Sequence, residues 1–511
     1  MTTSDSPIVT TVEGPVEGIV ENDVFVFKGI PYAKPPEGDL RWKKPADVEP
    51  WHGTTRMAKE YGNGSLQNPA VYEAGEGDPA KLGEDCLYLN VWTPKRDPID
   101  QPRLPVMVWI HGGAYILGAG SLPPHIGSPL VNKGAVVVTL NYRLGHLGFF
   151  AHPALAGKAL NSPVNFGLFD QIAALQWVQR NIEKFGGDPG NVTIFGQSAG
   201  AKSVLALFVS PLARGLFHRG VAQSVYGLEE ATREQALARG AAFATANNLA
   251  GAAATAAELR ALPAKDFYTS PTTNMPTAIA GDEVLPTSIL TAFKARQQAP
   301  VPLIIGSTSD DGSVLADVGP ELDPLEIVRQ LRANNFPFVL YYPGVTPDAE
   351  LGRQVCRDLV FTVTGRRFAE NHRPVSTVYR FYFDYTAVGL REDVAKHGTR
   401  HGDDVIYPFA TGDLCLPTKG IFTDADRAFQ AKVSEYWFKF ASTGTPSADG
   451  CAAWLPHKYE GIFMKDRMMH LTETPELKEN FMKERLKALV LVLGAIGQPG
   501  DEPEAEGEAS A

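Results

Sequence analysis

The sequence is poor in cysteine, has no long apolar run and carries no surplus of positive charge. Four cysteines in 511 residues are too few for a disulfide scaffold. The longest apolar stretch near the C-terminus, Ala488–Ile496, has nine residues, whereas a membrane helix needs about 20. The formal net charge of −11 disfavours binding to nucleic acid or to anionic membranes. We therefore expect a small-molecule partner, no nucleic acid and no stable membrane insertion; the oligomeric state is left open.

The two ends of the chain also lack features. Residues 1–14 contain no basic patch followed by an apolar run, so no secretory signal is predicted and a cytoplasmic protein is expected. Residues 501–511 contain acidic side chains but no Lys or Arg, and we expect a disordered tail there. No internal repeat or Gly/Ser linker is visible between these ends. Residues 1–500 are therefore predicted to form one domain.

Short apolar runs alternate with helical patterns along the chain. The helical spacing of apolar residues over 168–182 predicts a helix, with Asn165 as its N-cap and Gly186 as its stop. Further helices are predicted at Ala236–Ala246 and Phe429–Phe440. Strands buried on both faces are predicted at Val106–Ile110, Ala135–Leu140, Val192–Phe195 and Val301–Ile305, with a longer strand at Val375–Phe383. The lack of apolar–polar alternation within the strands indicates a parallel sheet covered by helices, and the alternation of strands with helices predicts an α/β fold with right-handed crossovers.

The segment Gly196-Gln197-Ser198-Ala199-Gly200 follows one of these strands directly. A sharp turn from strand to helix leaves the serine hydroxyl exposed and requires glycine on both sides, which fits a nucleophile. By chance alone such a motif is about as often a serine in an ordinary glycine turn. The strand before it and the small-residue helix expected after it favour the nucleophile. The amide of Ala199 at the helix start is then a candidate oxyanion donor.

A second glycine turn follows the strand at 104–110 and reads His111-Gly112-Gly113-Ala114. It resembles the His-Gly-Gly loops of lipases and esterases, whose backbone amides face the substrate carbonyl oxygen. A plain turn is the alternative. We favour the functional interpretation, with the amides of Gly113 and Ala114 as further oxyanion donors.

Most of the chain resembles the type-B carboxylesterase family, which includes the cholinesterases and bacterial p-nitrobenzyl esterases. The resemblance covers roughly residues 10–460. It is carried by segments that occur in the family's order: residues 27–33, 40–42, 84–91, 141–145, 165–200, 401–409 and 436–446. The resemblance implies an α/β-hydrolase fold, which has a mostly parallel, twisted sheet with helices on both faces and large insertions near the active site. It also implies a triad in the order Ser, acid, His.

The resemblance places the acid of the triad in the loop Ser309-Asp310-Asp311-Gly312. Asp311 takes the position of the family's usual glutamate, which is one methylene longer, so the loop must lie closer to the histidine. Asp310 is the competing candidate. Without the resemblance, two acids in such a loop are usually a solvated turn.

The resemblance also selects the base from eleven histidines. His401, in His401-Gly402-Asp403-Asp404, lies in what looks like the family's histidine loop, and His397 is the nearest rival. Two histidines four residues apart can bind a metal on a helix, but the glycines at 398 and 402 and the lack of an H-E-x-x-H pattern disfavour this. No feature of the sequence requires a metal or an organic cofactor.

Three other positions follow from the resemblance. Ser224 stands where the family often has a serine that supports the triad, although an ordinary structural hydroxyl is an equal alternative. Gln197 replaces a residue that is often glutamate in the cholinesterase branch, so choline esters are expected to be poor substrates. Cys86 lacks the upstream cysteine that secreted members pair with it, because Ser65 stands there. This fits a reducing compartment.

These observations predict a serine carboxylesterase that hydrolyses neutral esters through an acyl-Ser198 intermediate. One alternative is a non-catalytic, neuroligin-like binding protein of the same fold, since fold alone does not prove chemistry. Another is a relative that hydrolyses amides, carbamates or complex natural esters. The sequence leaves the acyl and alcohol groups undefined.

Overall fold

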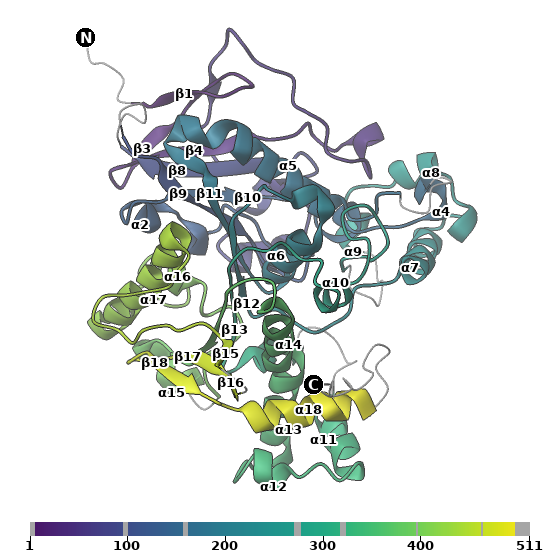
Figure 1. The fold of residues 1–511 in the computed structure, drawn as a ribbon. Helices are drawn as coiled ribbons and strands as arrows, with labels where there is room; N and C mark the ends of the chain where they lie inside the picture. The colour runs from purple at the N-terminus through teal and green to yellow at the C-terminus, as the bar shows by residue number, and fades with distance from the viewer. Residues whose placement is uncertain are drawn as a thin grey trace, which may run out of the picture.

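The computed structural model describes residues 6–95, 101–156, 162–269, 277–316, 323–394, 397–460 and 463–495. The predicted acidic tail at 501–511 lies outside the described residues. A large mixed sheet runs through the centre of the molecule, with helices on both faces (Figure 1).

Within the described residues this sheet has eleven strands in the order β18-β17-β14-β13-β12-β11-β9-β10-β8-β4-β3. The strands from β17 to β10 in this order are parallel to their neighbours, and the strands at both edges are antiparallel. Their bounds are β3 Ile19–Glu21, β4 Val24–Pro31, β8 Tyr88–Pro94, β9 Leu104–Ile110, β10 Val136–Leu140, β11 Gly187–Gln197, β12 Arg219–Gln223, β13 Leu303–Thr308, β14 Val378–Phe383, β17 Arg467–Leu471 and β18 Glu476–Glu479. The predicted α/β fold with a mostly parallel sheet is confirmed.

Short strands form small separate pairings: β1 Ile8–Thr10, β2 Pro15–Glu17 and β5 Arg56–Met57; β6 Gly64–Ser65 and β7 Leu82–Gly83; β15 Lys458–Glu460 and β16 Phe463–Lys465. The helices are α1 Pro69–Ala74, α2 Ser128–Val131, α3 Gly145–Gly148, α4 Pro153–Ala156, α5 Phe166–Asn181, α6 Ala199–Val209, α7 Arg233–Ala246, α8 Ala256–Arg260, α9 Asp266–Thr269, α10 Ile289–Lys294, α11 Pro324–Ala333, α12 Phe338–Tyr341, α13 Asp348–Arg357, α14 Val363–His372, α15 Arg391–Val394, α16 Ile406–Phe409, α17 Asp424–Thr443 and α18 Lys483–Ala495. No helix among the described residues has the length and apolar character that crossing a membrane requires.

Strand β9 shows why the central strands lack an apolar–polar alternation. Val106 and Val108 pack into the cluster that contains α5 and α6, while Met107 and Trp109 pack into the cluster that contains α17 on the opposite face. Side chains of a strand alternate between the two faces, so a strand covered on both sides is apolar throughout. The sheet is therefore held between two cores, and its carboxyl ends are the rigid edge on which loops are positioned.

Some strands begin later than expected because the backbone amides of their first expected residues form hydrogen bonds in a preceding turn or because a proline has no amide proton. The strand expected from Ala135 begins one residue later because the amide of Ala135 donates to Leu130 at the end of α2. The strand expected from Val375 begins at Val378, because the amides of Val375 and Ser376 close the end of α14. The strand expected at Val301–Ile305 starts after Pro302, which has no amide proton, and continues into polar residues.

The expected role of the Asn165 side chain as the cap of α5 is wrong. Asn165 occupies the N-cap position, but its side chain makes no capping hydrogen bond. It forms two hydrogen bonds with the backbone of Ile279, at 2.7 and 2.8 Å. The side-chain amide of Asn165 therefore binds the buried loop at residue 279 and not the first turn of the helix. Gly186 does end the segment that follows α5, with φ +80°.

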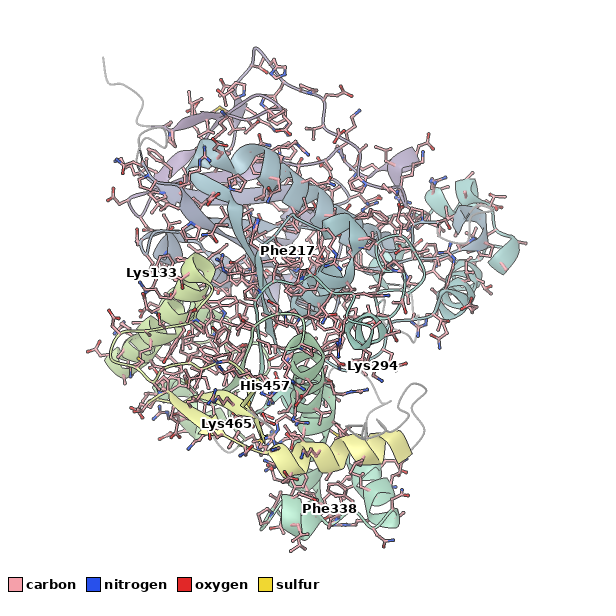
Figure 2. The ribbon with its side chains drawn as sticks, viewed as in Figure 1. Lys133, Phe217, Lys294, Phe338, His457 and Lys465 are labelled. Carbon is pink, nitrogen blue, oxygen red and sulfur yellow. The ribbon has the colours of Figure 1, made fainter. Side chains whose placement is uncertain are left out.

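A helical lobe lies beyond the sheet. Helices α11, α12, α13 and α18 meet there, and Phe338 of α12 lies at its outer end (Figures 1 and 2). Leu331 of α11, Val355 of α13 and Leu486 of α18 share one apolar cluster. Residues 488–495 of the apolar C-terminal run thus lie in α18, which packs on this lobe through Leu486 and Leu489.

All four cysteines are free thiols. Cys86 is buried, and burial raises the pKa of its thiol above the usual range although the Ser65 hydroxyl is hydrogen-bonded to it. Ser65 is thus the neighbour of Cys86, in the place where the resemblance put it.

Candidate active site

Ser198 lies between a strand and a helix in a strained backbone conformation. Strand β11 ends at Gln197, α6 begins at Ala199, and Ser198 between them has φ 56° and ψ −123°. The glycines on both sides are required by space. A Cβ on Gly196 would lie 2.6 Å from the carbonyl carbon of Gly200, and one on Gly200 would lie 2.0 Å from the carbonyl oxygen of Ile110. The local sequence therefore forces the serine into a sharp turn at the carboxyl edge of the sheet.

His401 and Asp311 lie together at the same edge. Nδ1 of His401 is 2.8 Å from Oδ1 of Asp311, and the other carboxylate oxygen accepts a hydrogen bond from the amide of Thr308 at 2.7 Å. Asp311 is fully buried, and the ring of Phe361 packs on the imidazole at 5.1 Å between centroids. A buried, hydrogen-bonded carboxylate fixes one tautomer of an imidazole and stabilises its protonated form.

The two rival candidates have other partners. Asp310 forms an ion pair with Arg353, and burial raises the pKa of its carboxyl to about 6 although the Arg353 charge opposes this. His397 is half exposed, and its Nδ1 lies 3.0 Å from a carboxylate oxygen of Glu350. Neither contacts the His401 ring, so the geometry favours the predicted pair.

Hydrogen bonds join the loop of Asp311 to the loop of His401. The amide of Asp310 donates to the carbonyl of Thr399 at 2.8 Å, and the amide of Thr399 donates to Oγ of Ser309 at 2.8 Å. The amide of His401 itself donates to Oγ of Ser313 at 2.9 Å. These serines fix the distance between acid and base, and sequence reasoning missed them because a serine in a glycine loop carries no periodic signal.

The predicted oxyanion loop reaches the serine closely. A Cβ on Gly112 would lie 3.2 Å from Cβ of Ser198 and 2.6 Å from the carbonyl oxygen of Gln197, so only glycine fits there. Gly113 and Ala114 both have positive φ, 103° and 52°. Among the described residues, the amides of Gly113, Ala114 and Ala199 donate no hydrogen bond. Three free amides next to a serine hydroxyl suit a developing oxyanion.

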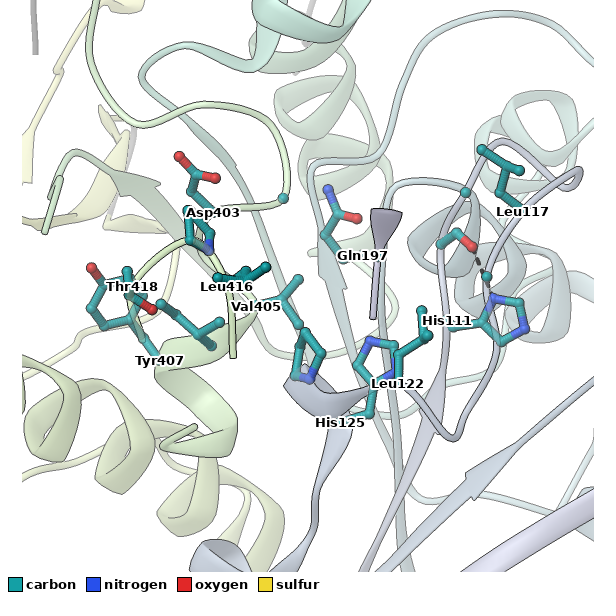
Figure 3. A pocket seen from close by; sticks show the side chains of 18 of the residues that line it. His111, Leu117, Leu122, His125, Gln197, Asp403, Val405, Tyr407, Leu416 and Thr418 are labelled. Atoms are coloured by element: carbon teal, nitrogen blue, oxygen red, sulfur yellow. Dashed lines mark hydrogen bonds between the residues drawn. The ribbon is translucent and has the colours of Figure 1, made fainter. Parts of the chain in front are cut away.

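A cavity of about 350 Å³ adjoins the site. Residues next to the triad line its inner end, and Figure 3 shows Gln197 between the wall with Asp403 and Tyr407 and the wall with His111 and Leu117. Leu416 of the lining is 57% exposed, and its amide donates to the carboxylate of Glu76 at 2.9 Å. The cavity suits one uncharged, mainly apolar group of a substrate.

Two further polar side chains at the triad were not predicted in these roles. Nε2 of the Gln197 amide lies 3.1 Å from Nε2 of His401. Asp404 is fully buried, and burial raises the pKa of its carboxyl to about 7 against the hydrogen bond that Gln223 donates to it at 2.8 Å. Asp404 was visible only as part of the histidine loop; nothing in its sequence neighbourhood indicates burial beside Asp311.

Ser224 lies at the end of β12 with φ 56°, fully buried. Its amide donates to the carbonyl of Gly306 at 2.8 Å, while its hydroxyl has no hydrogen-bond partner among the described residues. The geometry gives it a place beside strand β13, which leads to Asp311, but no direct bond to the triad.

Fold and site together define an α/β-hydrolase, with a serine on a strand–helix turn and a histidine–acid pair from later loops. A family model described as "Carboxylesterase family" matches residues 5–336 and 349–489. The chain belongs to this family and is a carboxylic ester hydrolase of the serine carboxylesterase type.

Relatives and solved structures agree with this assignment. The fumonisin B1 esterase of Sphingopyxis macrogoltabida is 35% identical over 487 residues, which cover 90% of this chain and 87% of that protein. The para-nitrobenzyl esterase of Bacillus subtilis is 34% identical over 474 residues, 86% of this chain and 91% of that protein. A solved PNB esterase structure matches 94% of this chain and 99% of that chain, at a TM-score of 0.81 and 31% identity. A Geobacillus stearothermophilus carboxylesterase structure also has a TM-score of 0.81, at 28% identity and the same coverage of each chain.

Proposed function

We propose that Ser198, His401 and Asp311 are the nucleophile, base and acid of this esterase, and that the amides of Gly113, Ala114 and Ala199 form its oxyanion hole. The observation that carries the proposal is the 2.8 Å contact between His401 and the buried Asp311, beside a serine held in a strained turn. A serine hydroxyl is a weak nucleophile until a neighbouring base takes its proton.

In the proposed reaction, the neutral imidazole of His401 takes the proton of Ser198 as its oxygen attacks the ester carbonyl. Asp311 holds the proton on Nδ1 and stabilises the imidazolium that forms. The carbonyl oxygen, now negative, lies among the three amides, each worth on the order of 3 kcal/mol in comparable enzymes. The imidazolium then protonates the leaving alkoxide. Water then attacks the carbonyl of the acyl-Ser198. His401 takes a proton from the water and returns a proton to the Ser198 oxygen as the acid leaves.

We infer that the substrates are neutral esters with a mainly apolar alcohol group. The cavity beside Gln197 is the natural place for that group, because its lining is mostly apolar and Asp403, its one carboxylate, is paired with Arg400 at 3.0 Å. The names of the relatives describe a p-nitrobenzyl ester and fumonisin B1 as substrates of those proteins. A p-nitrobenzyl ester is therefore a reasonable first substrate here.

We further propose that residues 1–500 act as one catalytic unit and that the protein works in the reducing cytoplasm. Four free cysteines, with Cys86 beside Ser65, fit that compartment. Ser224 is proposed to support the triad indirectly, through its backbone bond to Gly306 at the root of the acid loop.

A phosphonate that reacts with active-site serines tests the assignment. We expect stoichiometric inactivation of p-nitrobenzyl ester hydrolysis, one added phosphonyl group per chain, and its location on the peptide containing Ser198. Labelling at another serine with complete loss of activity would contradict the proposal.

A further inference from the structure

The side chain of Gln197 contacts the atom of His401 on which the reaction depends. Asp311 faces Nδ1, so in the neutral ring Nδ1 carries the proton and Nε2 carries the lone pair. The Gln197 amide nitrogen lies 3.1 Å from that Nε2. Only the NH₂ end of the amide can donate to a neutral imidazole nitrogen. The Ser198 hydroxyl makes no hydrogen bond to it within the described residues.

We propose that in the free enzyme the Gln197 amide donates a hydrogen bond to Nε2 of His401, and that in the substrate complex it donates to an oxygen of the substrate instead. This side chain thereby selects esters whose alcohol group carries an uncharged hydrogen-bond acceptor. The inference rests on the proposed esterase function and deepens it. Two donors, the Gln197 amide and the Ser198 hydroxyl, compete for one lone pair. A substrate that offers an ether, hydroxyl or carbonyl oxygen to the amide frees the base for Ser198.

The position of the amide supports this role. Its carbonyl end faces the oxyanion loop, since a Cβ on Gly112 would lie 3.0 Å from Oε1 of Gln197. Its nitrogen end faces the histidine loop, since a Cβ on Gly402 would lie 3.8 Å from Nε2. The side chain thus spans the space between the loops and lines the cavity proposed for the alcohol group (Figure 3).

The acceptor that fits is uncharged. Asp403 lines the same cavity and disfavours a second carboxylate, even though Arg400 is paired with it. Several other donors of the lining already have partners within the protein: the Gln67 amide donates to the carbonyl of Gly118, the Tyr385 hydroxyl to Asp426 and the Thr418 hydroxyl to the carbonyl of Gly412. A neutral hydrogen bond in such a site contributes about 0.5–1.5 kcal/mol net.

An amide at position 197 also affects protonation of the base. A hydrogen bond donated to the neutral imidazole opposes its protonation, whereas a carboxylate in the same place would favour it. The other titratable or charged groups near the imidazole are Asp311, the neighbouring Asp404, and Asp403 with its partner Arg400. These are identical in all variants, so differences between variants report on position 197.

The experiment compares the 2-methoxyethyl and n-butyl esters of one acid, which differ by one oxygen in place of a methylene. Values of kcat/KM are measured across the acidic limb of the pH profile and divided by the rates of hydroxide-catalysed hydrolysis. We expect the protein to prefer the methoxyethyl ester by about fivefold beyond that chemical ratio. Gln197→Met, which keeps the volume but has no donor, should lose the preference and move the acidic limb to higher pH. Gln197→Glu should move the limb further in the same direction.

Several outcomes would overturn the inference. Equal corrected ratios in the unmodified protein and Gln197→Met exclude recognition of the substrate oxygen by Gln197. If the acidic limb of the pH profile lies at the same pH in both variants as in the unmodified protein, the hydrogen bond from Gln197 to His401 is excluded. If Gln197→Met does not fold, the corrected ratio of the unmodified protein decides alone: a value near one overturns the inference. Absence of hydrolysis of both esters by the unmodified protein contradicts the proposed function instead.

Discussion

Nδ1 of His401 lies 2.8 Å from Oδ1 of Asp311, although 90 residues separate them in the chain. The two loops are also joined by a hydrogen bond from the Asp310 amide to the Thr399 carbonyl and by one from the His401 amide to the Ser313 hydroxyl. The neighbouring carboxylate of Asp310 points to Arg353 instead. The two adjacent acids of this loop thus have different partners.

These different partners predict different effects when each aspartate is replaced by asparagine. Asp311→Asn leaves the shape unchanged but allows the wrong imidazole tautomer, so kcat should fall by about 10⁴-fold. Asp310→Asn loses only the Arg353 pair and should keep kcat within a few-fold. Steady-state kinetics on one ester, with circular dichroism to confirm folding, compare the variants. A larger loss in Asp310→Asn than in Asp311→Asn would reverse the assignment.

Replacing Ser198, the proposed nucleophile, tests the site without disturbing the fold. Ser198 is 8% exposed and its hydroxyl makes no hydrogen bond among the described residues, so Ser198→Ala should unfold at nearly the same temperature. Hydrolysis should fall by about 10³-fold or more, because the covalent route is lost. The matched control is Ser210→Ala, a buried serine on the far end of α6, which should keep full activity. Ester hydrolysis near the original rate in Ser198→Ala would reject the mechanism.

Much of this arrangement was predictable from the sequence. The strand before Ser198, the glycines at 196 and 200 and the His-Gly-Gly turn each have a steric reason that acts over a few residues. The family resemblance then indicated which acid and which histidine to choose. Local patterns with a physical cause transfer well from sequence to structure.

The remainder depends on contacts between distant segments. Nothing near Asn165 in the sequence indicates that its side chain binds the backbone at 279, and nothing near Asp404 indicates burial beside Asp311. The contact of Gln197 with His401 arises only when the two loops meet. Burial and partners of polar side chains are properties of the packed molecule, and periodicity does not encode them.

The close approach of the proposed oxyanion loop to Ser198 predicts that Gly112→Ala is mainly a kinetic defect. The added Cβ would lie 2.6 Å from the Gln197 carbonyl oxygen and must push the loop away from Ser198. Displaced amides should lower kcat by about 10²-fold or more while KM changes less. Gly365→Ala is the control, because its Cβ meets only one atom at 3.8 Å and a helical alanine should not destabilise the protein. Unchanged kcat in Gly112→Ala would remove the loop from the mechanism.

The buried carboxyl of Asp404 predicts a dependence of stability on pH. Its pKa is raised from 3.8 to about 7, so the folded protein holds a proton that the unfolded chain releases. The favourable contribution of the protonated form is complete below pH 3.8, and it is lost as the pH rises towards about 7. Asp404→Asn mimics the protonated form, so its stability relative to the unmodified protein should increase over this window. Denaturant midpoints at several pH values measure the difference.

A difference in stability between Asp404→Asn and the unmodified protein that stays the same at every pH would show that the Asp404 carboxyl titrates alike in the folded and unfolded states.

The neutral amide at position 197 predicts the response to a cationic alcohol group. The cavity presents Gln197 and an Asp403 already paired with Arg400, so its walls offer little net negative charge to a trimethylammonium group. Desolvating that cation costs free energy that its uncharged carbon analogue does not lose. We therefore expect kcat/KM for a choline ester to be no higher than for the 3,3-dimethylbutyl ester of the same acid. Gln197→Glu should raise the choline ratio, and added salt should reduce that gain because the attraction is electrostatic. A preference of about tenfold or more for the choline ester in the unmodified protein, weakened by salt, would mean that the paired Asp403 or the aromatic lining attracts cations without a charge at position 197.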